Sequence, residues 1–101
     1  MKFPEDPFIR ELLPEFIDDW INNLKELFLP ALETKNSEEL YRVGHTLKGS
    51  CFQFGLDEVA ELGITLMGYA KDQDWDKATA LYNEVKILFE DAKTELENNP
   101  V

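Results

Sequence analysis

The segment that decides the fold covers residues 38–55, which read EELYRVGHTLKGSCFQFG. When successive residues are placed about 100° apart on a helical wheel, five apolar side chains of this segment gather on one side. That side comprises Leu40, Val43, Leu47, Cys51 and Phe54. An apolar stripe at three- and four-residue steps predicts an amphipathic helix that buries this side in a core.

Polar residues and a glycine mark where this helix should begin and end. Residues 34–37 predict a turn, and either Asn36 or Ser37 can cap the helix N-terminus. Gly55 stands where a glycine commonly ends a helix. The segment is therefore expected to be helical from Glu38 to about Phe54.

The apolar residues outside this segment show the same helical spacing. They predict a short leading helix over 7–13, a long helix from Pro14, and further helices over 57–71 and 75–96. The stripe of the long helix comprises Phe16, Ile17, Trp20, Ile21, Leu24, Leu27 and Phe28. Pro30 should either kink or end that helix, because proline removes one backbone hydrogen bond. Four main helices with short loops predict an all-α, antiparallel four-helix bundle with a short additional N-terminal helix.

Length and composition limit the classes of function. The chain has 101 residues, of which 44% are hydrophobic, so one domain spanning residues 1–101 with a real core is expected. A net charge of -11 argues against nucleic acid or an anionic membrane as a partner. One histidine and one cysteine exclude the usual zinc sites and an internal disulfide. Without a membrane-length apolar run or a signal-peptide core, the chain is expected to be cytoplasmic. A monomer is the simpler expectation for its oligomeric state.

The only histidine lies on the opposite side of the helix from the core stripe. Several residues fall within about 60° of His45 on the wheel, among them Tyr41, Lys48, Gly49 and Phe52. Residues 40–56 contain no acidic residue, and Arg42 and Lys48 are their only full charges. The surface around His45 is therefore predicted to be a neutral or positive docking site with exposed aromatic area.

Two glycines inside this helix need an explanation. Gly44 and Gly49 each cost about 1 kcal/mol of helix stability relative to alanine. A helix that retains both needs bare backbone there. The backbone can serve close packing of a neighbouring helix or close approach of another molecule.

The residue types on this face favour phosphoryl chemistry. A histidine imidazole is partly neutral at pH 7, and its neutral form is a competent nucleophile. Lys48 lies about one helical turn beyond His45, where its ammonium group can balance an anion attached to the imidazole. Phosphorylation of a ring nitrogen of His45 fits these constraints.

The segment 45–50, His-Thr-Leu-Lys-Gly-Ser, with Gly55 ten positions after the histidine, closely resembles the signature of histidine-containing phosphotransfer (HPt) domains. The resemblance implies that His45 accepts a phosphoryl group from a receiver-domain aspartate and passes it to another receiver. It also implies that Lys48 stabilises the phosphoryl charge, that Gly49 leaves room for the receiver, and that Gly55 turns the chain.

The same resemblance implies the partners and the cofactor chemistry. The partners would be receiver domains of response regulators and hybrid histidine kinases, docking on a face formed by Tyr41, Arg42, Gly49 and Phe52. The receiver would supply Mg²⁺, and this chain would bind no cofactor. Because no glycine-rich nucleotide motif is present, the chain is expected to be a phosphocarrier without kinase activity. Phe52 replaces the small residue common in the family, so it can bias which receivers dock.

Two other functions fit the same residues. In the first, a separate ATP-dependent histidine kinase domain phosphorylates His45, as in chemotaxis kinases, and a kinase domain in the same polypeptide would favour this arrangement. In the second, the chain is a non-catalytic helical interaction module that binds through Tyr41 and Phe52. That module would bind its partner equally well after His45→Gln.

Overall fold

The computed structural model describes residues 1–98, so the end of the domain expected over residues 1–101 lies outside the described residues. These residues form helical elements and no strand. The elements are α1 (Pro7–Asn23), the π-helical turn η1 (Leu24–Phe28), α2 (Leu29–Glu33), α3 (Ser37–Gln53), α4 (Asp57–Asp72) and α5 (Trp75–Asn98).

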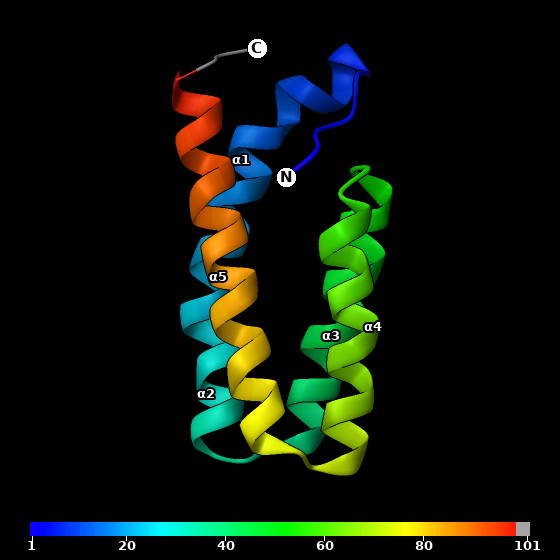
Figure 1. The fold of residues 1–101 in the computed structure, drawn as a ribbon, viewed down its shortest axis with the longest axis vertical. Helices are drawn as coiled ribbons and strands as arrows, with labels where there is room; N and C mark the ends of the chain where they lie inside the picture. The colour runs from blue at the N-terminus through cyan, green and yellow to red at the C-terminus, as the bar shows by residue number, and fades with distance from the viewer. Residues whose placement is uncertain (99–101) are drawn as a thin grey trace.

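The helices form an elongated bundle measuring 39 × 19 × 17 Å (Figure 1). The elements α1, η1 and α2 follow one another as a single rod that runs down one side of the bundle. The helix α3 returns upward, α4 runs down beside it, and α5 runs up beside the rod (Figure 1). The predicted all-α, antiparallel four-helix architecture is confirmed.

The leading helix expected over 7–13 is helical, but it is not separate. These residues are the first turns of α1, and Pro14 lies inside that helix rather than at the start of a new one. The side chain of Asp6 caps α1 by accepting a hydrogen bond from the backbone N–H of Phe8 at 2.9 Å. Because Pro14 cannot donate to the carbonyl of Arg10, the helix bends there. The first turns of α1 accordingly slant away from the bundle axis in Figure 1.

The helical rod does not end at Pro30. It accommodates the proline through the π-helical turn η1, which directly precedes α2. Pro30 occupies the first turn of α2, directly after η1, and the chain remains helical to Glu33. In η1 the backbone N–H of Leu29 donates to the carbonyl of Leu24, five residues earlier. A π-helical turn holds more residues than an α-helical one, so the residues near its end change phase. Leu27, expected in the core stripe, is consequently 51% exposed.

The core stripe predicted for α3 is confirmed at four positions. These are Leu40, Val43, Leu47 and Cys51, all of which are buried. The fifth, Phe54, is half-buried and stacks on Phe16 with ring centroids 4.0 Å apart. The core also contains Trp20, which stacks on Phe89 of α5. The side of α3 that carries His45 is thereby turned away from the core.

Candidate functional site

The two ends of α3 fix where the helix begins and stops. Asn36 caps its N-terminus, because its side-chain oxygen accepts a hydrogen bond from the backbone N–H of Glu39 at 3.2 Å. At the other end Gly55 adopts the left-handed conformation with φ of 73°. The backbone N–H of Leu56 then donates to the carbonyl of Cys51 at 2.8 Å, which closes the last turn. The predicted role of Gly55 as the helix terminator is confirmed.

A side-chain contact between α1 and α3 fixes the rotation of α3 about its axis. The indole Nε1 of Trp20 donates to the hydroxyl oxygen of Ser50 at 3.2 Å, and that hydroxyl donates to the carbonyl of Thr46 at 2.7 Å. Because Trp20 is buried in the core, this contact directs one edge of α3 toward α1. The outer face of α3 is left free of other helices.

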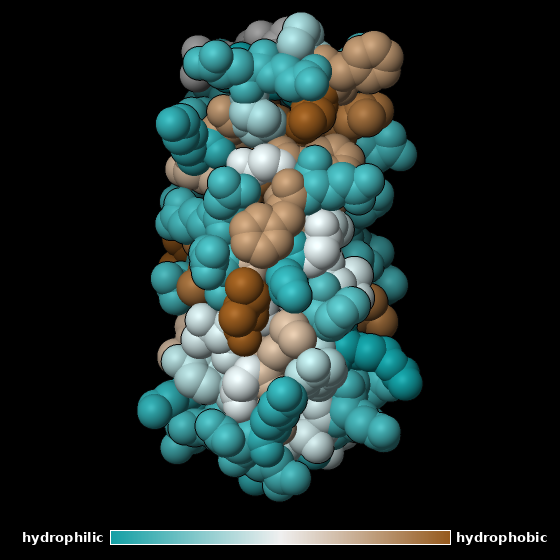
Figure 2. Space-filling model, turned by 90° about the vertical axis from the view of Figure 1, so that its right-hand side faces the viewer, coloured by the Kyte–Doolittle hydropathy of each residue, from teal (hydrophilic) through white to brown (hydrophobic). Residues whose placement is uncertain are grey.

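His45 lies exposed on this outer face, as predicted. Arg42, Gly49 and Phe52 are also exposed, whereas Tyr41 and Lys48 are half-buried. Tyr41 therefore contributes less free aromatic area than the helical wheel predicts. Figure 2 faces the side formed by α3 and α4 and shows apolar side chains at its centre, surrounded by hydrophilic ones.

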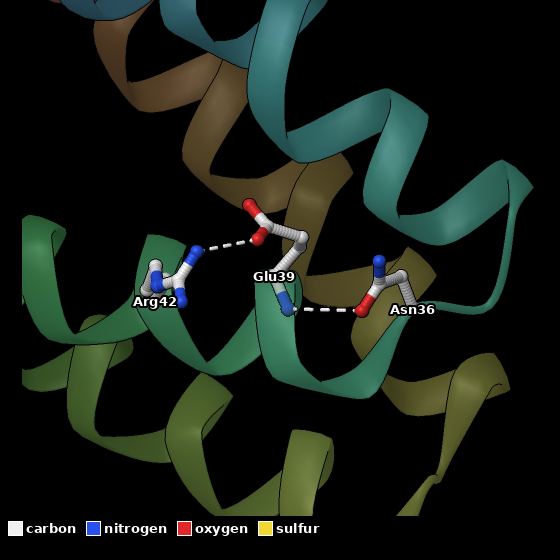
Figure 3. A network of polar contacts seen from close by, with 3 residues as sticks. All are labelled: Asn36, Glu39 and Arg42. Atoms are coloured by element: carbon white, nitrogen blue, oxygen red, sulfur yellow. Dashed lines mark hydrogen bonds and ion pairs between the residues drawn. The ribbon is translucent and has the colours of Figure 1, made fainter.

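The charge on this face differs in one respect from the prediction. The guanidinium of Arg42 forms an ion pair with the carboxylate of Glu39, with Nη1 and Oε1 2.6 Å apart (Figure 3). Glu39 lies one residue outside the acid-free segment, so the wheel of that segment does not show this pairing. None of the ion pairs formed within residues 1–98 involves Lys48. Lys48 is therefore a cation near His45 whose charge no carboxylate pairs within the described residues.

An open groove between α3 and α4 adjoins His45. Its lining includes Tyr41, His45 and Thr46 from α3, and Lys71 from α4. The ammonium group of Lys71 lies 5.5 Å from the centroid of the Tyr41 ring, within the range of a cation–π interaction. Reasoning from the α3 sequence missed Lys71, because a helical wheel does not show which residues of another helix lie beside it.

The two glycines of α3, Gly44 and Gly49, have different roles in the structure. A Cβ atom added at Gly44 would lie 2.9 Å from the carbonyl oxygen of Gly63 in α4, so this glycine permits close helix packing. A Cβ atom added at Gly49 would have no neighbouring group within 4 Å. Gly49 therefore serves no packing contact within the described residues. It leaves bare backbone on the surface one turn beyond His45.

Cys51 is buried and chemically protected. Burial raises the pKa of its thiol from 9.0 to about 12, an effect that a hydrogen bond with Ser50 partly opposes. We expect iodoacetamide at mildly alkaline pH to leave the folded chain unmodified and to alkylate Cys51 once denaturant is added. Mass spectrometry measures the adduct, and fast alkylation of the folded chain would contradict this burial.

The raised pKa of Cys51 also has a consequence for stability. Above a pH of about 9 the unfolded chain loses a thiol proton that the folded chain retains. The contribution of this group to stability is therefore complete below about pH 9 and is lost as the pH rises toward about 12. The small size and burial of Cys51 agree with its interpretation as a core residue.

Residues 1–98 do not bring three histidine, cysteine or acidic side chains together as a metal-binding group. In the same part of the chain, no helix has the length and apolar character that crossing a membrane requires.

Comparison with protein families agrees with the helical-bundle fold. The family model described as the Hpt domain matches residues 10–97. No curated protein and no solved structure gives a significant match. The matched segment contains most of α1 and all of the elements from η1 to α4. The chain therefore belongs to the Hpt domain family, whose members are phosphocarriers that interact with receiver domains in two-component signalling.

Proposed function

We propose that His45 accepts a phosphoryl group from the aspartyl phosphate of one receiver domain and passes it to the aspartate of another. The exposure of the only histidine at the middle of α3 is the observation that supports this proposal most strongly. The Hpt family match includes this position. The open backbone at Gly49 gives a second molecule room to approach.

The proposed transfer needs only a nucleophile from this chain. The unprotonated ring nitrogen of His45 attacks the phosphorus of the aspartyl phosphate, a phosphorus–nitrogen bond forms, and the bond from phosphorus to the aspartate oxygen breaks. The aspartate leaves as a carboxylate, and its attack on phosphohistidine reverses the step. Mg²⁺ belongs to the receiver in this mechanism, and this chain binds no cofactor.

The residues around His45 supply charge and surface. Lys48 is one helical turn away and has no ion-pair partner among residues 1–98, so its ammonium group stabilises the negative charge of the phosphoryl group. Gly49 lets the receiver backbone come close, and Phe52 offers apolar contact at 40% exposure. Tyr41 and Arg42 border this docking face, where the Arg42 ion pair with Glu39 reduces the net charge.

Label transfer from a receiver tests this function. The purified chain is mixed with a receiver that carries ³²P on its aspartate, in the presence of Mg²⁺ and without ATP. We expect the chain to gain a label that is labile in acid and stable in base, as phosphohistidine is. ATP alone, without a receiver or a kinase, should give no label.

Two results would contradict the proposal. If no receiver from a broad panel labels the chain but a histidine kinase domain with ATP does, the chain is a kinase-fed phosphoacceptor. If neither source labels it, the chain is an interaction module.

A further inference from the structure

Three residues on the outer side of α4 have no role in the function proposed above. Ile64, Gly68 and Lys71 stand four and three residues apart, so they form one stripe along the helix. Ile64 is 42% exposed, although it is a large apolar residue. Gly68 is exposed, and a Cβ atom added there would have no neighbouring group within 4 Å.

This α4 stripe lies beside the face of α3 that carries His45. A Cβ atom added at Gly44, the residue before His45, would lie nearest to Gly63 and Met67 of α4. Ile64 and Gly68 each directly follow one of these contact residues in the chain. Lys71 lines one groove together with His45, and Figure 2 shows apolar side chains near the centre of this side of the molecule. The stripe and the docking face therefore form one continuous surface.

The exposed glycine of the stripe has no structural use within the described residues. Gly44 and Gly63 allow α3 and α4 to pack closely, and Gly55 provides the left-handed turn. Gly68 does none of these, and it resembles Gly49 in facing open space. Glycine inside a helix is less favourable than alanine, so an exposed glycine without packing contacts is a helix defect that a close partner can explain.

The cation of the stripe also points to a specific kind of partner. The chain as a whole is strongly acidic, with a net charge of -11. Lys71 nevertheless lines the groove beside His45 and lies over the Tyr41 ring. A partner that brings an aspartyl phosphate to His45 is anionic at the point of contact. Electrostatic complementarity with such a partner favours cations at the margin of the site.

We propose that the α4 stripe of Ile64, Gly68 and Lys71 is the second half of the surface on which a receiver domain docks. This inference rests on the proposed function, because a receiver must cover the surface around His45 to bring its aspartate within bonding distance. Ile64 extends the apolar contact of Phe52, Gly68 admits the receiver backbone, and Lys71 attracts its acidic site.

Two variants and two matched controls test the role of α4. The variants are Gly68→Leu and Lys71→Glu, and the controls are Ala80→Leu and Lys86→Glu at exposed positions of α5. At a receiver concentration below saturation, we expect Gly68→Leu to slow phosphoryl transfer about tenfold or more, because the leucine occupies a docking contact. We expect Lys71→Glu to slow it about threefold to tenfold, with the loss shrinking as salt increases.

A small phosphoryl donor separates loss of docking from loss of reactivity or folding. Phosphoramidate transfers its phosphoryl group to an imidazole nitrogen as the phosphorus–nitrogen bond to ammonia breaks, and it needs no docking surface. We expect it to label Gly68→Leu at the rate of Ala80→Leu, whereas Lys71→Glu is judged by its salt dependence against Lys86→Glu, because phosphoramidate is itself an anion. Circular dichroism confirms that each variant is helical.

The outcomes distinguish a failure of the α4 docking inference from a failure of the proposed phosphotransfer function. If Gly68→Leu and Lys71→Glu accept phosphate at the control rate from every receiver that labels the wild-type chain, the α4 stripe is not part of the docking surface, and the proposed function stands. If no receiver labels the wild-type chain, the proposed function fails and this inference fails with it.

Discussion

Replacement of His45 by glutamine is expected to remove all acid-labile phosphoryl label from the chain. His45 is the only histidine, so no second imidazole can take over its role. Glutamine preserves a polar side chain at an exposed helical position but offers no nucleophilic ring nitrogen. The measurement is the amount of ³²P on the chain after incubation with a labelled receiver and Mg²⁺.

A folding control accompanies this variant. Because the His45 side chain is exposed, we expect the thermal unfolding midpoint of His45→Gln to stay close to that of the wild-type chain. Label that persists on the folded variant would show that another side chain is the phosphoacceptor. The proposed role of His45 would then be wrong.

Adding a methyl group to two different glycines should change stability in opposite directions. A Cβ atom at Gly63 would lie 2.7 Å from the backbone nitrogen of Lys48 and 2.8 Å from the carbonyl oxygen of Gly44. Backbone atoms cannot move aside as a flexible side chain does, so α3 and α4 must separate. We expect Gly63→Ala to lower the free energy of unfolding by about 2 kcal/mol. Gly49→Ala, which meets open space, should raise it by about 0.5–1 kcal/mol.

Urea denaturation followed by circular dichroism measures both changes. The two variants carry the same chemical substitution in neighbouring helices, so each is the control for the other. Equal stabilities of Gly63→Ala and Gly49→Ala would contradict the close packing of α3 on α4 and the separate uses of these glycines.

The sequence of α3 predicts which of its sides is buried, because the apolar residues repeat with the period of one helix. The apolar stripe from Leu40 to Cys51 and the exposure of His45 opposite it both follow from a spacing of 3.6 residues per turn. The left-handed turn at Gly55 was also predictable, and the N-cap could be narrowed to Asn36 or Ser37, because each depends on local backbone chemistry.

Other features depend on contacts that one helix does not specify. The wheel placed Leu27 in the core, but the π-helical turn before Pro30 changes the phase, and no periodic rule anticipates such a turn. The sequence showed that Gly44 and Gly49 both need bare backbone. The positions of neighbouring helices were needed to show that only Gly44 packs against α4. The place of Lys71 beside His45 likewise depends on the register between α3 and α4.

Transfer of labelled phosphate between two receivers tests most directly whether His45 is a phosphoryl carrier. A receiver labelled on its aspartate and a second, unlabelled receiver are mixed with Mg²⁺, with and without this chain, and the label on each protein is followed over time. We expect the second receiver to gain label only when the chain is present, after label has appeared on the chain, and not with His45→Gln. Label that reaches the second receiver equally well with His45→Gln, or that never leaves the wild-type chain, would contradict a carrier function.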